Sequence, residues 1–332
     1  MFRSVLVALA LLAAPALAQT AVPAPPDSLL ASVPFDRYLV EDDHGRTVTA
    51  YLSKASPSAE DPLPLVTMIE GSGCESSFVQ AGDRIGGGLQ YLLRRVVDGR
   101  ARVLAVEKPG VAFLDQTATP GTAVGCSAEF RREHTLGRWA DAVAAAVRAA
   151  QALPGVDPSR TLVAGHSEGG LVAARVAAQV PSVTHVASLA GGGPAQLFDM
   201  ALLARARAPE GQGDAAADAV FATWTGMLTD PESADAMIWG HPHRWWSSFG
   251  TASVTRELER TDAAVFVAQG QADTAVAPVG ADVLVAELRA RGRAVEFARV
   301  AGDHGFGAAP GDVDGLRAVF ERMADWFLAD AR

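Results

Sequence analysis

The sequence of 332 residues has only two cysteines, no cluster of basic residues and no long apolar run beyond its first residues. Acidic residues outnumber basic ones by 38 to 28, which gives a formal net charge of −10 at pH 7. We therefore expect no nucleic-acid partner, because that binding needs a basic surface. We also expect no membrane span in the mature chain, since no later segment is apolar over a sufficient length.

The first 18 residues have the three parts of a secretory signal. Arg3 supplies the positive start, an apolar core follows, and Ala16-x-Ala18 suits signal peptidase. We predict cleavage after Ala18 and export to a periplasm or the medium. Residues 19–34 are rich in Pro and Ala and predict a flexible leader.

Cys74 and Cys126 are the two cysteines. Two cysteines are too few for a structural zinc site. In an exported chain they favour one disulfide, and the alternative is a pair of buried free thiols. Nothing in the sequence sets the oligomeric state.

Short apolar runs alternate with helix-forming segments over residues 35–332. Each of these runs has strand character and is followed by turn residues; they are residues 35–40, 47–53, 63–69, 102–107, 161–164, 183–189, 263–268 and 295–300. Helices are expected at 136–153, after 167 and at about 314–329. The alternation predicts an α/β domain, a mostly parallel sheet with helices on both faces. Ligands bind such sheets beyond the carboxyl ends of their strands.

Residues 195–260 interrupt this alternation with helix-like runs and predict a helical lid inserted over the site. The segment holds four of the six tryptophans, Trp224, Trp239, Trp245 and Trp246. We expect most of these rings to fill the lid's own core. One or two of them are candidates to face a substrate.

The segment Gly165-His166-Ser167-Glu168-Gly169 lies between an apolar run and a helix-forming run. A strand-to-helix turn of so few residues strains the backbone of Ser167 and lifts its hydroxyl clear of the sheet. The flanking glycines are needed because a Cβ there would collide with neighbouring backbone. Ser167 is therefore the candidate nucleophile.

A serine nucleophile needs a base, and a third group that fixes the tautomer of the base. Of the seven histidines, only His304 lies in a Gly-rich loop after the last strand and before the closing helix, so we predict that it is the base. Asp273, in the loop after the preceding strand, is the favoured acid. Asp303 is the rival, although a neighbour of the base seldom turns back onto its ring.

The oxyanion formed by attack on a carbonyl needs preset N–H donors. The N–H of Glu168, which opens the helix after the elbow, is one candidate. The second is expected in the loop Glu70-Gly71-Ser72-Gly73; we assign it to Ser72, with Gly73 as the alternative.

The elbow, Asp273 and His304, in the order Ser-Asp-His, resemble the α/β-hydrolase family over nearly all of the chain after residue 35. The resemblance implies an α/β-hydrolase fold with a lid and a secreted serine hydrolase. It would cleave carboxylic esters, small to medium in size and partly apolar, through an acyl-enzyme, without metal or organic cofactor. Glu70 departs from the histidine common at that place in lipases. A peptidase, aminopeptidase or thioesterase is the alternative enzyme, and a binding protein on the same scaffold is the alternative outside enzymes.

Overall fold

A computed structural model describes residues 19–25, 28–55, 62–309 and 311–329. The predicted signal segment, residues 1–18, lies outside the described residues. Within the described ranges, no helix is both long and apolar enough to cross a bilayer.

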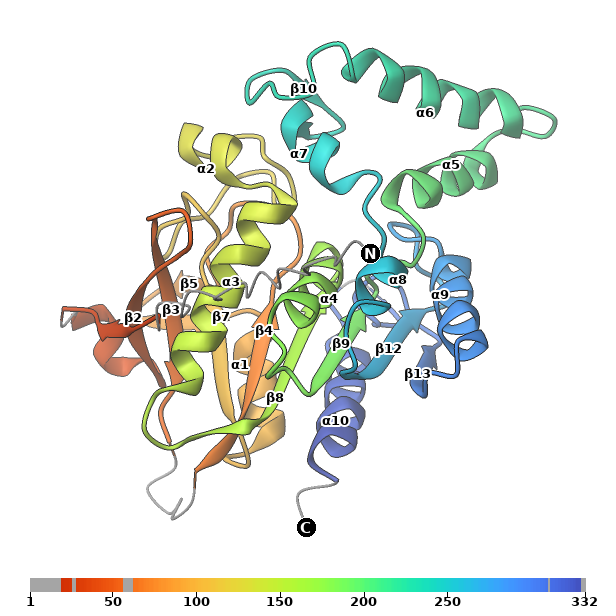
Figure 1. Ribbon diagram of the computed structural model, residues 1–332. Helices are drawn as coiled ribbons and strands as arrows, with labels where there is room; N and C mark the ends of the chain where they lie inside the picture. The colour runs from red at the N-terminus through yellow and green to blue at the C-terminus, as the bar shows by residue number, and fades with distance from the viewer. Residues whose placement is uncertain (1–18, 26–27, 56–61, 310, 330–332) are drawn as a thin grey trace, which may run out of the picture.

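A nine-stranded sheet forms the centre of the molecule (Figure 1). Its spatial order is β1 (Ala21–Pro23), β2 (Phe35–Glu41), β3 (Thr47–Ser53), β7 (Arg102–Val106), β4 (Leu63–Ile69), β8 (Val156–His166), β9 (His185–Leu189), β12 (Ala264–Gly270) and β13 (Val295–Val300). The first three strands and the β3–β7 pair are antiparallel, and all pairs from β7 to β13 are parallel. The prediction of a mostly parallel sheet is confirmed.

Helices cover both faces of this sheet. The helices of the chain are α1 (Leu89–Val97), α2 (Ala128–Glu133), α3 (Leu136–Gln151), α4 (Glu168–Gln179), α5 (Gln196–Arg207), α6 (Gly213–Met227), α7 (His243–Phe249), α8 (Val254–Leu258), α9 (Pro278–Ala290) and α10 (Asp314–Leu328), with a 3-10 turn at Ser28–Ser32. Two small hairpins add β5 (Phe78–Ala81) with β6 (Arg84–Gly87), and β10 (Met237–Ile238) with β11 (His241–Pro242).

The hydrophobic core is divided by the sheet into two layers. One layer packs α3, α4, α8 and α9 on the sheet, and the other packs α1 and α10. Strand β8 contributes side chains to both layers, because successive side chains of a strand point to opposite faces of the sheet. Val163 lies in the first layer, while Leu162 and Ala164 lie in the second. The near-continuous apolar sequence of β8 follows from this burial on both faces.

Part of the predicted leader has regular structure. Residues Ala21–Pro23 form β1, which pairs antiparallel with Tyr38–Val40 of β2. Pro residues are tolerated there because β1 is an edge strand, where a missing N–H breaks no internal ladder. Within the described residues 19–25 and 28–34, the segment thus differs from a wholly loose leader.

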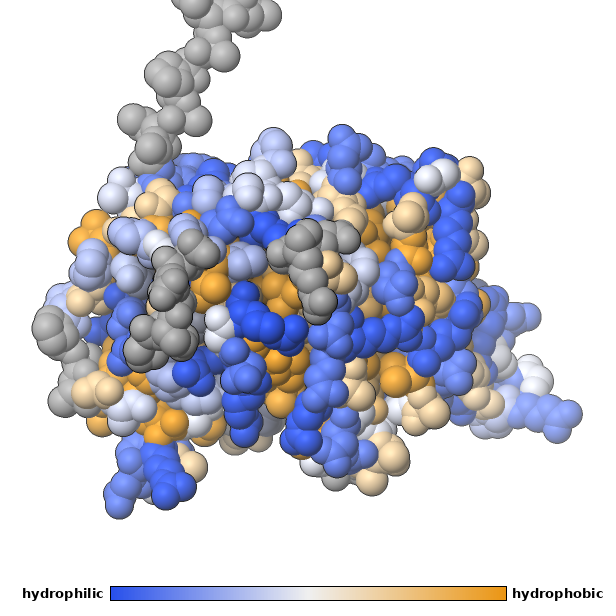
Figure 2. All heavy atoms as spheres, turned by 90° about the horizontal axis from the view of Figure 1, so that it is seen from below, coloured by the Kyte–Doolittle hydropathy of each residue, from blue (hydrophilic) through white to orange (hydrophobic). Residues whose placement is uncertain are grey.

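The segment 195–260 rises above the carboxyl ends of the strands (Figure 1). Helices α5 and α6 pack on each other there, and α7 contacts α3 of the body. Helix α8, at the end of the segment, instead packs on α4 and α9 of the body. Below, we use "lid" for α5, α6, β10, β11 and α7. Figure 2 shows the opposite face of the molecule, where hydrophilic and hydrophobic residues are interspersed.

The entrance and the exit of the lid are joined by hydrogen bonds. The N–H of Leu197 donates to the carbonyl of Gly250, at 3.0 Å. The hydroxyl of Ser253 and the N–H of Thr255 both donate to the carbonyl of Gly193, at 3.0 and 3.3 Å. These contacts form a neck through which the lid leaves and rejoins the body.

Candidate active site

Ser167 lies at the sharp turn between β8 and α4, with φ 56° and ψ −123°. This is an unfavourable backbone conformation for a residue that carries a Cβ. A Cβ on Gly165 would overlap the carbonyl of Gly169, and one on Gly169 would overlap the carbonyl of Ile69 in β4. The two glycines therefore permit the close crossing of helix and strand, as the sequence predicted. The N–H of Ser167 donates to Leu189 of β9 at 2.8 Å, which fixes the turn.

His304 and Asp273 meet at the same edge of the sheet, in the loops after β13 and β12. The distance from His304 Nδ1 to Asp273 Oδ2 is 2.8 Å. The Asp273 side chain is fully buried, while 28% of the His304 side chain is exposed. An ionised Asp273 requires Nδ1 to carry the proton, so the neutral ring has Nε2 free to accept one.

The surroundings of Asp273 keep it ionised. Burial raises its pKa, but the hydrogen bond and charge of His304 and the N–H groups of Val276 and Ala275 outweigh burial and hold the pKa below its usual value. Gln269 also donates to Oδ2 at 2.9 Å. The rival carboxylate, Asp303, instead accepts the N–H groups of Gly305 and Gly307 in its own loop.

His166, beside Ser167, supports the loop that carries His304. Its Nε2 lies 2.8 Å from the carbonyl oxygen of His304, and the two rings are 4.8 Å apart. Burial lowers the pKa of His166 to about 4, so the ring is neutral and donates from Nε2. The elbow and the His304 loop are thereby held against each other.

The loop Glu70-Gly71-Ser72-Gly73 also packs on the elbow. A Cβ on Gly71 would lie 3.3 Å from Cβ of Ser167, and Ser72 lines the same cavity as Ser167 and Glu168. Gly73 does not line this cavity, and a Cβ there would lie 2.8 Å from the nitrogen of Gly121. Of the two residues proposed as second oxyanion donor, Ser72 thus has the position facing the cavity.

Lys108 holds this loop from behind, which the sequence did not reveal. Its buried ammonium donates to the carbonyls of Gly71 and Gly73, at 2.6 Å for Gly73. In a trans peptide the C=O and the following N–H point in opposite directions. Because Lys108 binds the carbonyl of Gly71, the N–H of Ser72 points away from Lys108.

Two buried carboxyl groups accompany Lys108. Burial raises the pKa of Glu70, which accepts the N–H of Leu89 at 2.9 Å. Burial also raises the pKa of Glu107 to about 7, although it accepts the hydroxyl of Ser76 at 2.6 Å. Glu70 thus anchors the loop to the start of α1, in place of the histidine common in lipases.

The side chain of Glu168 connects the elbow with the lid. Its two oxygens lie 2.9 Å from His134 Nε2 and 2.9 Å from Trp245 Nε1. Burial raises the pKa of Glu168, but the charge and hydrogen bond of His134 outweigh burial and lower it. Burial lowers the pKa of His134. Both pKa shifts agree with an ionised Glu168 that accepts a hydrogen bond from a neutral His134.

Among the four lid tryptophans, only Trp245 lines the cavity above Ser167. Trp224 and Trp246 are buried in the core shared by the lid and the body. Trp239 is 39% exposed, and its ring contacts the ring of Trp246. The cavity has a volume of about 80 Å³. Its lining includes Ser72, Ser167, Glu168, Asp199, His241 and Trp245.

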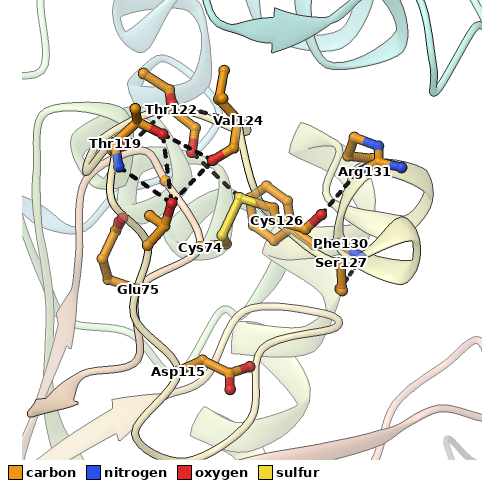
Figure 3. The surroundings of a disulfide bond; sticks show 12 residues. Cys74, Glu75, Asp115, Thr119, Thr122, Val124, Cys126, Ser127, Phe130 and Arg131 are labelled. Atoms are coloured by element: carbon orange, nitrogen blue, oxygen red, sulfur yellow. Dashed lines mark hydrogen bonds between the residues drawn. A yellow bond between two sulfur atoms is a disulfide. The ribbon is translucent and has the colours of Figure 1, made fainter.

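The predicted disulfide is confirmed: Cys74 and Cys126 are bonded, with their Cα atoms 5.9 Å apart. Figure 3 shows that it ties the segment after Gly73 to the loop before α2. In the described ranges, no group of three or more His, Cys, Asp or Glu side chains is arranged to hold a metal ion.

No protein-family model matches the sequence, and no curated protein is significantly similar to it. Solved structures are similar in fold. The esterase Est1E from Butyrivibrio proteoclasticus, solved with ferulic acid bound, superposes with a TM-score of 0.58 at 16% identity, over 87% of this chain and 99% of that one. Acetyl xylan esterase 1 from Thermoanaerobacterium sp. JW/SL YS485 gives 0.53 at 17% identity, over 92% and 87%.

A peptidase is also similar. Dipeptidyl peptidase 4 from Porphyromonas gingivalis gives a TM-score of 0.58 at 13% identity, over 89% of this chain and 35% of the peptidase. The chain thus spans about a third of that peptidase and nearly the whole of Est1E. At these identities the similarity concerns the fold.

Proposed function

We propose, starting from the α/β-hydrolase fold of this chain, that it is a serine hydrolase that cleaves carboxylic esters through an acyl-enzyme on Ser167. The observation that carries the proposal is the 2.8 Å hydrogen bond between His304 and a fully buried Asp273, beside the strained elbow of Ser167. A buried acid, a base and a serine at one sheet edge are the parts that acyl transfer needs.

In the proposed reaction, Nε2 of His304 takes the hydroxyl proton as Ser167 Oγ attacks the ester carbonyl. The oxyanion accepts hydrogen bonds from the N–H groups of Glu168 and Ser72. Asp273 stabilises the imidazolium that forms. His304 then gives its proton to the leaving alkoxide, and an acyl group remains on Ser167. Water, activated by His304, releases the acid by the same steps in reverse.

Ester cleavage is favoured over the alternatives by the similar esterases, which match this chain over nearly their whole length. The similar peptidase has most of its chain outside the match. A peptidase or thioesterase of the same mechanism is the second candidate. Export is proposed from the signal-like residues 1–18 and is supported by the disulfide, since disulfides persist in oxidising compartments. N-terminal sequencing of the exported protein tests this proposal, and we expect the chain to begin at residue 19.

A fluorophosphonate probe tests the nucleophile, because it reacts with a serine that a base activates. We expect the wild-type protein to be labelled and Ser167→Ala to be unlabelled, with loss of 4-nitrophenyl ester hydrolysis. Ser159→Ala is the matched control, since Ser159 is exposed in the first half of the same strand. Labelling of folded Ser167→Ala would contradict the proposal, and a folded wild type that is never labelled would favour a binding protein.

A further inference from the structure

Asp199 is a second carboxylate in the cavity above Ser167, and the proposed reaction does not use it. It lies in the first turn of α5, where the lid begins, and is 4% exposed. Its carboxylate fits between two glycines of the body. A Cβ on Gly192 would lie 2.9 Å from Oδ2, and one on Gly280 would lie 2.9 Å from Oδ1. The absence of side chains at these two positions makes room for a charged group.

This carboxylate is incompletely paired. Oδ1 makes no hydrogen bond within the described part of the chain, although it is buried. Glu168 in the same cavity differs, since both of its oxygens have partners. No lysine or arginine lines the cavity. A buried carboxylate without a cation is unfavourable, and a ligand that supplies the cation removes that cost.

The titratable side chains that line the cavity are either negatively charged or neutral. Burial raises the pKa of Asp199 to about 7; the N–H of Ala277 opposes this and the charge of Asp273 adds to it. Burial lowers the pKa of His241, another lining residue, to about 4, so that ring is neutral. An anionic substrate finds no cation in this lining, whereas a cationic one finds the carboxylate of Asp199.

We propose that Asp199 binds a positively charged amine or quaternary ammonium group of the substrate, so that the preferred esters carry a cation in the part that enters this cavity. This inference rests on the proposed function, because it names the substrate class of the same site. The competing explanation is structural: Asp199 accepts the N–H of Ala277, which caps α9, and serves only to hold the lid on the body.

The test uses pairs of esters that differ in charge but hardly in shape. The 4-nitrophenyl esters of alanine and isobutyric acid place an ammonium or a methyl group beside the carbonyl. Trimethylammoniobutyryl and 5,5-dimethylhexanoyl esters place a trimethylammonium or a tert-butyl group farther away. Choline and 3,3-dimethylbutyl esters of one acid test the leaving-group side. The ratio of kcat/KM within a pair, divided by the ratio of the spontaneous hydrolysis rates of the two esters, cancels their intrinsic reactivity and the amount of folded enzyme.

We expect the wild type to prefer the cationic member of at least one pair by about tenfold or more, a typical effect of a buried ion pair. Asp199→Asn should bring that ratio close to one, because the amide keeps the shape of the side chain but not its charge. Asp214→Asn is the control, because it removes the same charge from an exposed position on α6. A neutral preference in every pair, or a ratio that Asp199→Asn leaves unchanged, would overturn the proposal.

The dependence of this ratio on pH separates binding from a structural role. Below about pH 7, Asp199 is protonated and neutral, so the preference for the permanently charged trimethylammonium ester should fall; above it, the preference should rise. Glu168 and His241 also line the cavity, and the charge of Asp273 acts on Asp199, but Asp199→Asn leaves all three in place and should give a flat ratio. If neither ester of any pair is hydrolysed, or Ser167→Ala hydrolyses them equally well, the proposed function itself fails.

Discussion

The hydrogen bond between His304 and Asp273 determines which nitrogen of the imidazole faces the substrate. An amide at position 273 would present either a donor or an acceptor to Nδ1, and the donor form stabilises the wrong tautomer. The same carboxylate also receives three other N–H groups, from Gln269, Ala275 and Val276. Its role is therefore to hold both the charge and the ring orientation.

Asp273→Asn should lower kcat on a 4-nitrophenyl ester by about 10³–10⁴-fold, with little change in the far-UV circular dichroism, because the isosteric amide keeps the packing but not the tautomer. Steady-state kinetics measure the effect. Asp303→Asn is the comparison, since Asp303 binds only backbone of its own loop. If Asp303→Asn proves the more damaging change, the acid has been assigned to the wrong residue.

At the level of elements, the loop after β4, in which we propose the second oxyanion donor, is held by a side chain from the next strand of the sheet. Lys108 stands at the end of the neighbouring strand β7 and binds two carbonyls of the loop. One ammonium thus fixes two peptide planes at once. Catalysis by an oxyanion hole depends on donors that are already oriented when charge develops.

Lys108→Met should lower kcat about 10–100-fold and leave KM nearly unchanged, because the oxyanion forms only as the carbonyl is attacked. The affinity for a trifluoromethyl ketone inhibitor should fall in parallel with kcat, which a merely structural role would not require. Lys54→Met is the control, since Lys54 is the chain's other lysine and binds Val33 far from the loop. Equal losses of kcat and thermal stability in both variants would contradict a positioning role.

At the level of the whole molecule, the disulfide joins residues 52 positions apart and restricts the unfolded chain. In the chain-entropy model a loop of that length contributes about 4 kcal/mol of stability. Chemical denaturation with and without mild reductant should therefore show a large loss of stability on reduction. Ester hydrolysis should fall as well, because Cys74 follows the oxyanion loop directly. Stability and rate that both survive reduction would show that the bridge supports neither.

The sequence predicted those features that short-range patterns specify. Strand–turn–helix spacing identified Ser167, and chain order after two strands identified Asp273 and His304 as candidates. Lys108, Asp199 and the partners of Glu168 were missed because they depend on contacts between residues far apart in the sequence. Glu168, for example, is 34 positions from His134 and 77 from Trp245. Local sequence carries no mark of such pairs. For Lys108, the indication in the sequence was its position at the end of a predicted strand, before Pro109 and Gly110.

The neck at Gly193 and Gly250 has a consequence for how such a protein changes over evolution. The two ends of the lid are hydrogen-bonded to each other, so the lid leaves and rejoins the body at one place. Insertions, deletions or wholesale exchange between these two points leave the spacing of β9 and β12 untouched. The body, with the proposed triad, and the lid can therefore diversify as separate modules. In the proposed hydrolase, exchange of the lid would change specificity while Ser167, Asp273 and His304 stay in place.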